Sequence, residues 1–469
     1  MKENIQIVFG LLGGLAVFIY GMNMMSECLQ KAAGDKMKSI LALLTKNPLL
    51  GVLAGALTTA VLQSSSATTV MAIGFVSAGL MNLPQAISII FGANIGTTMT
   101  AQIIAFKISD YIYVIIFIGF LISFVTKSEK VKSIGQTIFA FGLLFLGIET
   151  MGDVMKPLAS SPVFTDLIGR VAHIPVLGVA VGTLMTLVVQ SSSATIAVLQ
   201  NFASQPGPDG VTSIIGLAGA IPILLGDNIG TTITALLASI GQSKDAKRTA
   251  VAHCIFNISG CFLFIWFVKP FAALIQSISP KGPEIEAISR QIANAHTVFN
   301  ITMTLIWVCL IKLMVKIVMT LIPDGKKGVE DPGSPIYLDE NIISQPAAAL
   351  QLVAKEIFRM SDQVGDILKK TIELVKNEEV KSIDGLKENG KQVERLGKCI
   401  TEYLAALFSS GSLTEQQAAQ TASLMCVLSD VERMGTLSVE MAECMLERSD
   451  RKYKYTPEAM DELQKSLKV

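Results

Sequence analysis

The sequence Gln-Ser-Ser-Ser-Ala-Thr occurs twice, at residues 63–68 and 190–195, and each copy interrupts a stretch of apolar residues. Polar side chains are costly at membrane depth, so two such insertions predict that the serines line a site. Hydroxyl groups at a helix break, together with the unpaired N–H groups of the next half-helix, can bind a small oxyanion without Lys or Arg. The expected chemistry is anion binding.

The duplication extends beyond the hexapeptide. An offset of 127 residues also aligns Pro48 with Pro175. A second motif follows each copy, Gly-Ala-Asn-Ile-Gly-Thr-Thr at 92–98 and Gly-Asp-Asn-Ile-Gly-Thr-Thr at 226–232. We therefore expect two copies of one unit, over residues 45–107 and 172–242. The motifs cut the apolar stretches into pieces of roughly 8–15 residues, too short to cross about 30 Å of hydrocarbon, which predicts broken or re-entrant helices.

The motifs also contain ligands for a cation. The oxygens of Gln, Asn and Thr, with carbonyl groups freed where Gly-x-Asn-Ile-Gly unwinds, suit an alkali ion. Ala93 in the first copy corresponds to Asp227 in the second, and a carboxylate at membrane depth costs about 2.5–3.5 kcal/mol unless it faces a cavity or a partner. We expect Asp227 to bind a cation or balance its charge, with a capping role at a half-helix as the alternative. Adjacent anion and cation sites indicate ion-coupled transport.

The composition indicates a polytopic membrane protein with a soluble part attached. Hydrophobic residues make up 51% of the 469 residues. Residues 1–323 hold 32 charged side chains, whereas residues 324–469 hold 44. We expect a transmembrane domain over 1–322, a linker over 323–343 and a helical domain over 344–469. Long apolar runs predict spanning helices near 5–25, 111–126, 134–152, 254–275 and 297–322.

The tail after the last span shows amphipathic patterns. They predict helices near 344–377, 379–408, 413–447 and 456–467. Four lysines near the end of the last span, Lys312, Lys316, Lys326 and Lys327, predict that this end and the tail are cytoplasmic.

The paired Gln-Ser-Ser-Ser motifs, each followed by Gly-x-Asn-Ile-Gly-Thr-Thr, resemble the type II sodium/phosphate cotransporter family, whose bacterial members often carry a PhoU-like helical domain. The tail sequences Val-Glu-Arg-Leu-Gly at 393–397 and Val-Glu-Arg-Met-Gly at 431–435 resemble PhoU-like bundles. The acidic residue that commonly follows the Gly there is replaced by Lys398 and Thr436, which argues against metal binding. The resemblance implies an all-α polytopic membrane protein with two inverted repeats and broken helices, followed by a cytosolic helical bundle.

The resemblance also implies symport of inorganic phosphate with sodium by alternating access, across the inner cell membrane. The candidate phosphate ligands are Ser64, Ser65, Ser66, Ser191, Ser192, Ser193, Asn94 and Asn228. The candidate sodium ligands are Gln63, Gln190, Thr68, Thr195, Thr97, Thr98, Thr231, Thr232 and Asp227. Phosphate, sodium, the lipid bilayer and a cytosolic regulatory partner of the tail are the expected partners. We expect no organic cofactor and no nucleic acid.

Two further segments resemble each other, His253-x-x-Phe-Asn257 and His296-x-x-Phe-Asn300. His and Asn at i and i+4 share a helix face, so interhelical hydrogen bonds are the simpler interpretation and a proton relay is the other. Other functions stay open. A phosphate sensor, channel or exporter could use the same pocket. A membrane-embedded serine hydrolase is disfavoured because no Gly-x-Ser-x-Gly motif is present and the histidines have no evident pairing with a nucleophile.

Overall fold

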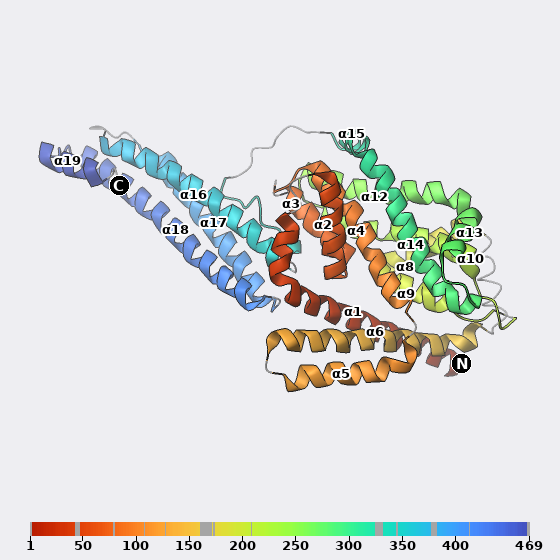
Figure 1. The fold of residues 1–469 in the computed structure, drawn as a ribbon. Coiled ribbons are helices and arrows are strands. Elements are labelled where there is room, and N and C mark those ends of the chain that lie inside the picture. Colours follow the sequence, from red (N-terminus) through yellow and green to blue (C-terminus); the bar gives the residue numbers. More distant parts are fainter. Residues whose placement is uncertain are drawn as a thin grey trace. The chain divides into compact units, whose positions relative to one another are not determined.

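The structure is a computed structural model, and it describes residues 2–42, 47–77, 80–106, 108–126, 128–159, 171, 174–207, 209–323, 332–343, 346–376, 382–411 and 413–466. The named elements in these ranges are all helices, so the predicted all-α class is confirmed (Figure 1). Contacts divide the chain into two compact units, Met1–Asp324 and Gly325–Val469.

One group of helices in the first unit lies outside the two repeated segments. It consists of α1 (Lys2–Ala42), α5 (Ile112–Val125) and α6 (Glu129–Ala159). Its buried core includes Phe18 of α1 and Leu144 of α6. Small residues bring the backbones close together, since a Cβ atom on Gly21 would lie 2.8 Å from the Leu144 nitrogen. Helix α6 therefore packs between α1 and α5 (Figure 1).

The repeated segments fold into matching sets of helices. The first set is α2 (Pro48–Leu62), α3 (Ser65–Ser77) and α4 (Leu83–Ile104). The second is α8 (Pro175–Val189), α9 (Ser192–Ala203), α10 (Gly216–Gly230) and α11 (Thr232–Ala238). In both sets the first helix packs on the third through glycines. A side chain on Gly55 would overlap the Ile89 carbonyl, and one on Gly182 would overlap the Ile223 carbonyl.

The prediction that Gly-x-Asn-Ile-Gly unwinds its helix is wrong. Residues 92–98 lie within α4, which is continuous over 22 residues. The second copy ends α10 at Gly230, but the next residue, Thr231, keeps right-handed helical angles of φ −59° and ψ −25°. The motif glycines serve close packing instead, since a Cβ atom on Gly96 would lie 2.6 Å from the Thr59 Cβ atom and one on Gly230 would lie 2.7 Å from the Thr186 Cβ atom.

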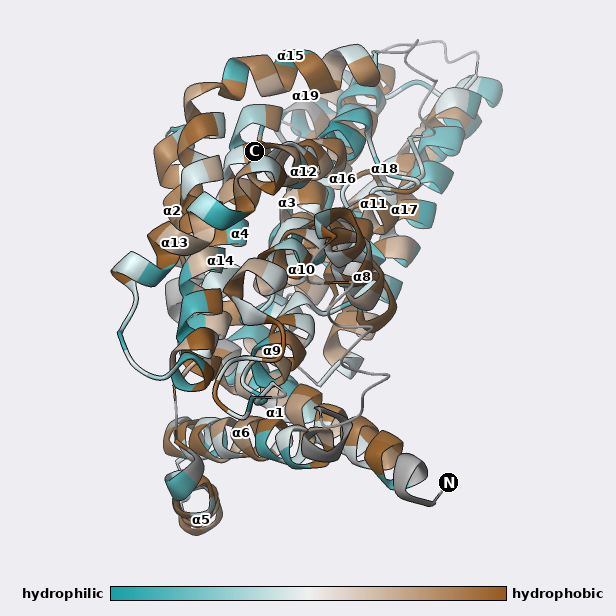
Figure 2. Ribbon diagram, turned by 90° about the vertical axis from the view of Figure 1, so that its right-hand side faces the viewer, coloured by the Kyte–Doolittle hydropathy of each residue, from teal (hydrophilic) through white to brown (hydrophobic). Residues whose placement is uncertain are grey.

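Six helical segments in the described ranges are long and apolar enough to cross a membrane, and hydrophobic residues dominate this unit (Figure 2). The spans expected near 254–275 and 297–322 are longer and interrupted. The first comprises α12 (Lys244–Phe264), a 3₁₀ turn and α13 (Val268–Ile278), and the second comprises α14 (Glu284–Cys309) and α15 (Ile311–Leu321). Hydropathy did not reveal these breaks because the pieces on both sides of each are apolar.

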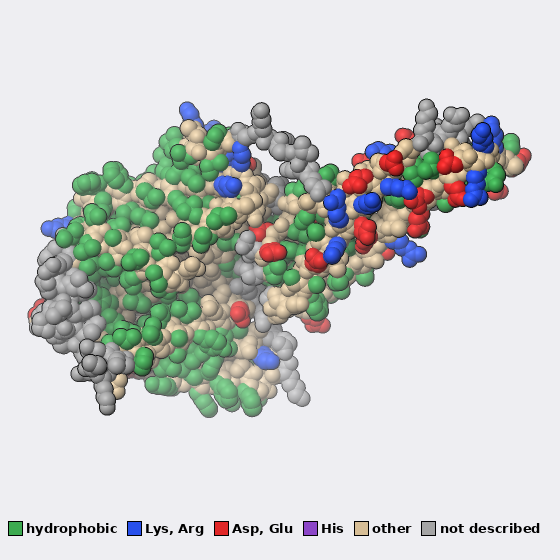
Figure 3. Space-filling model, turned by 180° about the vertical axis from the view of Figure 1, so that it is seen from behind, with side chains coloured by type: hydrophobic (Ala, Val, Ile, Leu, Met, Phe, Trp, Pro, Cys, Tyr) green, Lys and Arg blue, Asp and Glu red, His purple; other side chains and the backbone are tan. Residues whose placement is uncertain are grey.

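The second unit is a bundle of long amphipathic helices whose surface carries many charged side chains (Figure 3). Its elements are α16 (Pro346–Lys376), α17 (Asp384–Ser409), α18 (Glu415–Asp450) and the short α19 (Pro457–Ser466). Each agrees with a predicted helix to within a few residues. Gly385 and Gly390 lie inside α17 without breaking it.

The segment 332–343 packs against this bundle. The buried Glu356 carboxylate accepts hydrogen bonds from the Ile336 and Tyr337 N–H groups at 3.0 and 2.6 Å, and Arg359 pairs with it at 2.6 Å. The Tyr403 hydroxyl donates to the Asp339 carbonyl at 2.8 Å. Burial and the nearby Asp339 charge raise the pKa of Tyr403, so this hydroxyl stays a donor.

Candidate functional site

Each Gln-Ser-Ser-Ser motif forms a tight turn between two short helices. Gln63 joins α2 to α3 with φ 52°, and Gln190 joins α8 to α9 with φ 54°. This left-handed conformation costs a residue with a side chain roughly 1–2 kcal/mol, and such strain persists where the surroundings fix it. After each turn a serine caps the next helix: the Ser64 and Ser191 hydroxyls accept the N–H groups of Ala67 and Ala194, both at 3.2 Å.

The two turns face one cavity of about 260 Å³, so the structure brings both motifs together. A third wall comes from α1. None of the lining residues in the described chain carries a formal charge. The lining residues are Ile19, Met22, Asn23, Ser26, Gln63, Ser64, Ser65, Ser66, Val189, Gln190, Ser191, Ser192 and Ser193.

The cavity is rich in hydrogen-bond donors. Helices α3 and α9 begin at Ser65 and Ser192, so the N–H groups of their first residues have no partner within the helix. The positive ends of two helix dipoles lie at the same cavity. Ser65 and Ser192 are buried, with 5% and 9% of their surface exposed. This arrangement can bind a small oxyanion with neutral groups alone.

A separate polar cluster surrounds Asp227 on α10. Its carboxylate accepts a hydrogen bond from the Thr186 hydroxyl at 2.6 Å, and the Thr186 and Thr195 hydroxyls lie 3.1 Å apart. Asp227 is fully buried, and no described residue donates to its second carboxylate oxygen. The first copy has the equivalent contact between Thr59 and Thr68 at 2.8 Å, where Ala93 replaces the carboxylate.

The predicted ligands Asn94 and Asn228 do not line the cavity. Their side-chain oxygens lie 3.1 Å from His253 Nε2 and 3.3 Å from His296 Nε2, respectively. These contacts join α12 to α4 and α14 to α10, so the interpretation of the histidine segments as interhelical hydrogen bonds is confirmed. In each segment the Asn four residues later, Asn257 or Asn300, donates to the carbonyl of its His.

The remaining candidate ligands are also outside the cavity. Thr97 and Thr231 donate to carbonyls four residues earlier in their helices, and Thr98 and Thr232 donate to carbonyls three residues earlier. Such bonds satisfy a hydroxyl within the helix. The structure thus separates the candidates into five groups. They are a serine cavity that includes both glutamines, the Asp227 cluster, the Thr59–Thr68 contact, the two Asn–His pairs and the helix-internal threonines.

Comparison with protein families identifies the first unit. The Na+/Pi-cotransporter model matches residues 17–153 and 151–279, a span that contains both serine turns and the Asp227 cluster. The chain belongs to the Na+/Pi-cotransporter family. The PhoU domain model matches residues 357–445, which include most of α16 to α18. This protein is therefore a multi-pass membrane protein of a phosphate-transporter family with a PhoU domain in its second unit.

Individual proteins resemble the chain to different extents. A Bacillus subtilis protein named "Uncharacterized protein YqeW" is 35% identical over 263 residues, 56% of this chain and 83% of that protein. The Salmonella typhimurium "Putative inorganic phosphate export protein YjbB" is 23% identical over 94% of this chain and 78% of its own. Human "Sodium-dependent phosphate transport protein 2B" is 34% identical over 28% of this chain and 19% of its own. No solved structure matches.

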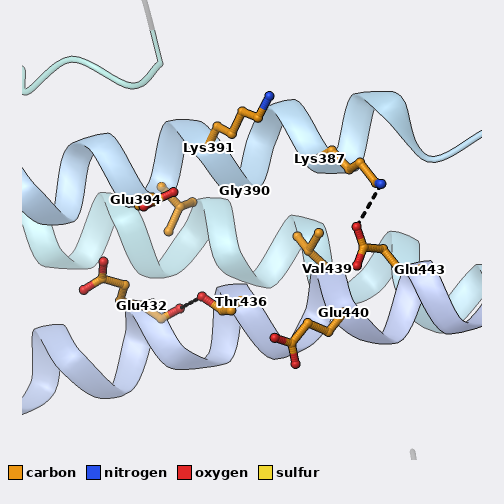
Figure 4. Close-up of a pocket in the computed structure, with 10 residues that line it drawn as sticks. Lys387, Gly390, Lys391, Glu394, Glu432, Thr436, Val439, Glu440 and Glu443 are labelled. Atoms are coloured by element: carbon orange, nitrogen blue, oxygen red, sulfur yellow. Dashed lines mark hydrogen bonds and ion pairs between the residues drawn. The ribbon is translucent and has the colours of Figure 1, made fainter.

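The PhoU domain has a groove of its own between α17 and α18 (Figure 4). Lys387 and Glu443 form an ion pair at 2.8 Å across it, and the Thr436 hydroxyl donates to the Glu432 carbonyl. Within the described ranges, no group of three or more His, Cys, Asp or Glu side chains is arranged to hold a metal ion.

Sequence reasoning about this cotransporter-family chain missed the α1 wall of the cavity. Asn23 and Ser26 lie three residues apart within an otherwise apolar run, and this spacing places them on one helix face. That spacing of two polar residues is the sequence signal for this wall. Thr186 was also missed as a partner of Asp227, although its match to Thr59 marked it as part of the repeat.

Proposed function

We propose that the chain is a sodium-coupled symporter of inorganic phosphate that works by alternating access. The observation that carries the proposal is the meeting of both Gln-Ser-Ser-Ser turns at one uncharged cavity. Membership of the Na+/Pi-cotransporter family and the sodium-dependent name of the human relative support the substrate and the coupling ion.

Phosphate binds between the two serine turns. The hydroxyls of Ser64 to Ser66 and Ser191 to Ser193 donate to its oxygens, as do the first N–H groups of α3 and α9. Hydrogen bonds to a charged partner are shorter and stronger than those between neutral groups, so several neutral donors can replace a cation. Asn94 and Asn228 are not among the proposed phosphate ligands, because their oxygens pair with histidines.

Sodium binds at the Asp227 cluster. A carboxylate and two threonine hydroxyls, from Thr186 and Thr195, supply oxygen ligands of the kind that hard cations prefer. The unpartnered carboxylate oxygen supports this assignment, since a buried charge needs compensation. Thr195 lies in the first turn of α9, so a cation here adjoins the half-helix that donates to phosphate, which would couple the two ligands.

The PhoU domain is cytoplasmic and regulates transport. Lys244 and Arg248 of α12 donate to the Pro323 and Ile322 carbonyls, each at 2.9 Å. The start of α12 and the end of α15 therefore lie at the same end of the first unit, and α15 carries Lys312 and Lys316. Such a concentration of basic residues favours the cytoplasmic side.

Labelled phosphate flux into proteoliposomes tests the proposal. Under inward gradients of sodium, lithium or potassium, sodium alone should drive uphill phosphate uptake. A channel or sensor would show no uphill movement. The relatives named as phosphate exporters favour outward transport as the second candidate, and loaded vesicles with the gradient reversed would detect it.

A further inference from the structure

The cavity has one wall that neither repeat supplies. Ile19, Met22, Asn23 and Ser26 of α1 face the space into which both serine turns project. Helix α1 packs mainly against α6, outside the two repeated segments. The repeats supply two matched serine motifs, whereas the side chains of α1 have no counterpart in either repeat.

The cavity is lined by three amide side chains, and they differ in their hydrogen bonds to the rest of the chain. Gln63 is engaged at both ends, because its nitrogen donates to the Ala60 carbonyl at 2.6 Å and its oxygen accepts from Thr100 at 3.0 Å. No hydrogen bond joins the Asn23 or Gln190 side chain to another described residue. Ser26, the other polar residue of the α1 wall, donates to the Leu62 carbonyl. Asn23 is therefore the uncommitted polar group of this wall.

The protonation of the substrate makes an uncommitted acceptor useful. Inorganic phosphate carries one or two O–H groups at neutral pH, whereas sulfate carries none. The serine turns present N–H groups, which only donate, hydroxyls, of which Ser64 and Ser191 already accept a backbone N–H, and the amide of Gln190. An amide oxygen can only accept. The α1 wall lines the same cavity as the serine turns, so Asn23 is available to an anion seated on the first turns of α3 and α9.

We propose that Asn23 selects protonated tetrahedral oxyanions, such as phosphate and arsenate, against sulfate. Its side-chain oxygen accepts the hydrogen bond from the O–H group of the bound anion, and its amide nitrogen donates to a second oxygen. A site built to pair with a substrate O–H group discriminates strongly against an analogue that lacks it. This inference rests on the proposed transport of phosphate and adds the residue that sets its selectivity.

The test uses the full chain in proteoliposomes, with sodium-driven phosphate flux measured against added sulfate or arsenate. Asn23→Leu removes donor and acceptor at similar size. We expect the KM for phosphate to rise at least about 10- to 150-fold, the range expected for one hydrogen bond to a charged partner, because the substitution removes two such bonds. The ratio of the sulfate inhibition constant to the phosphate KM should fall at least tenfold, while the arsenate ratio stays constant. Asn23→Gln, which keeps the amide, should restore part of the selectivity.

Tyr20→Phe is the matched control, since Tyr20 lies on the same helix with 64% of its surface exposed and does not line the cavity. Asn23→Ala serves if the leucine variant fails to reach the membrane. A lower maximal flux with unchanged KM and unchanged sulfate ratio would reduce Asn23 to a structural role and overturn the inference. Absence of phosphate flux in the unsubstituted protein would instead overturn the transport proposal and the inference with it.

Discussion

Ser65 and Ser192 occupy equivalent positions in the two turns, and both are buried at the cavity. Each is proposed to donate one hydrogen bond to the anion, and such a bond to a charged group contributes about 1.5–3 kcal/mol. Ser65→Ala or Ser192→Ala should therefore weaken the apparent phosphate affinity about 10- to 150-fold, measured as the KM of sodium-driven flux. Ser123→Ala, on the outer helix α5, is the control. Unchanged affinity in both cavity variants would disprove the phosphate assignment.

Asp227 makes the two repeats electrically unequal. Asp227→Asn keeps the shape and one oxygen ligand but removes one negative charge, so sodium should be affected before phosphate. We expect a higher sodium concentration for half-maximal flux, and a changed charge movement per phosphate, because a unit charge crossing the full field contributes about 2.3 kcal/mol per 100 mV. Flux against sodium at clamped membrane potential measures both. Wild-type values for both would leave Asp227 as a structural residue bonded to Thr186.

At the scale of helices, the repeated glycines let α2 pack closely on α4 and α8 pack closely on α10. A side chain on Gly92 would overlap the Val52 carbonyl, and one on Gly226 would overlap the Val179 carbonyl. Because backbone atoms cannot rotate away, Gly92→Ala or Gly226→Ala should cost at least the roughly 1–3 kcal/mol typical of overpacking. The yield of monodisperse protein after detergent extraction should fall sharply. Gly13→Ala is the control, since nothing lies within 4 Å of its Cβ position.

The sequence predicted the helix breaks at Gln63 and Gln190 because strongly polar residues interrupted apolar stretches in both copies. The predicted unwinding at Gly-x-Asn-Ile-Gly was wrong because glycine can either break a membrane helix or allow close helix packing. The neighbouring helix decides which of the two occurs. Matched glycines at 51 and 178 were the available indication of a contact surface. They pack against Ser88 of α4 and Pro222 of α10.

Only part of the candidate site could be predicted from the sequence. Duplication identified the serines, but long-range partners depend on helix packing that local sequence does not encode. The pairing of Asn94 with His253 joins residues 159 positions apart. Likewise the α1 wall comes from a helix outside both repeats. The amphipathic tail helices were predicted well because their apolar positions recur with the helical period along the whole length.

At the scale of the whole molecule, the cavity joins helices from two groups of the first unit. Asn23 belongs to the α1, α5 and α6 group, whereas the serine turns belong to the repeats. Alternating access requires a binding site whose walls move relative to each other. A site shared between two helix groups meets that requirement, since movement of the repeats against α1 would open the cavity on one side and close it on the other.

The proposed transport pathway lies entirely in the first unit. The cavity, the Asp227 cluster and both repeats lie before Pro323, and the contacts of Lys244 and Arg248 with the end of α15 need no residue beyond it. A protein ending at Pro323 should therefore insert and retain sodium-dependent phosphate flux per inserted molecule within about tenfold of the full chain, with altered control. Flux in proteoliposomes, normalised to inserted protein, measures this. A correctly inserted truncated protein without flux would show that the PhoU domain takes part in transport, because no other part of the proposed pathway would have been removed.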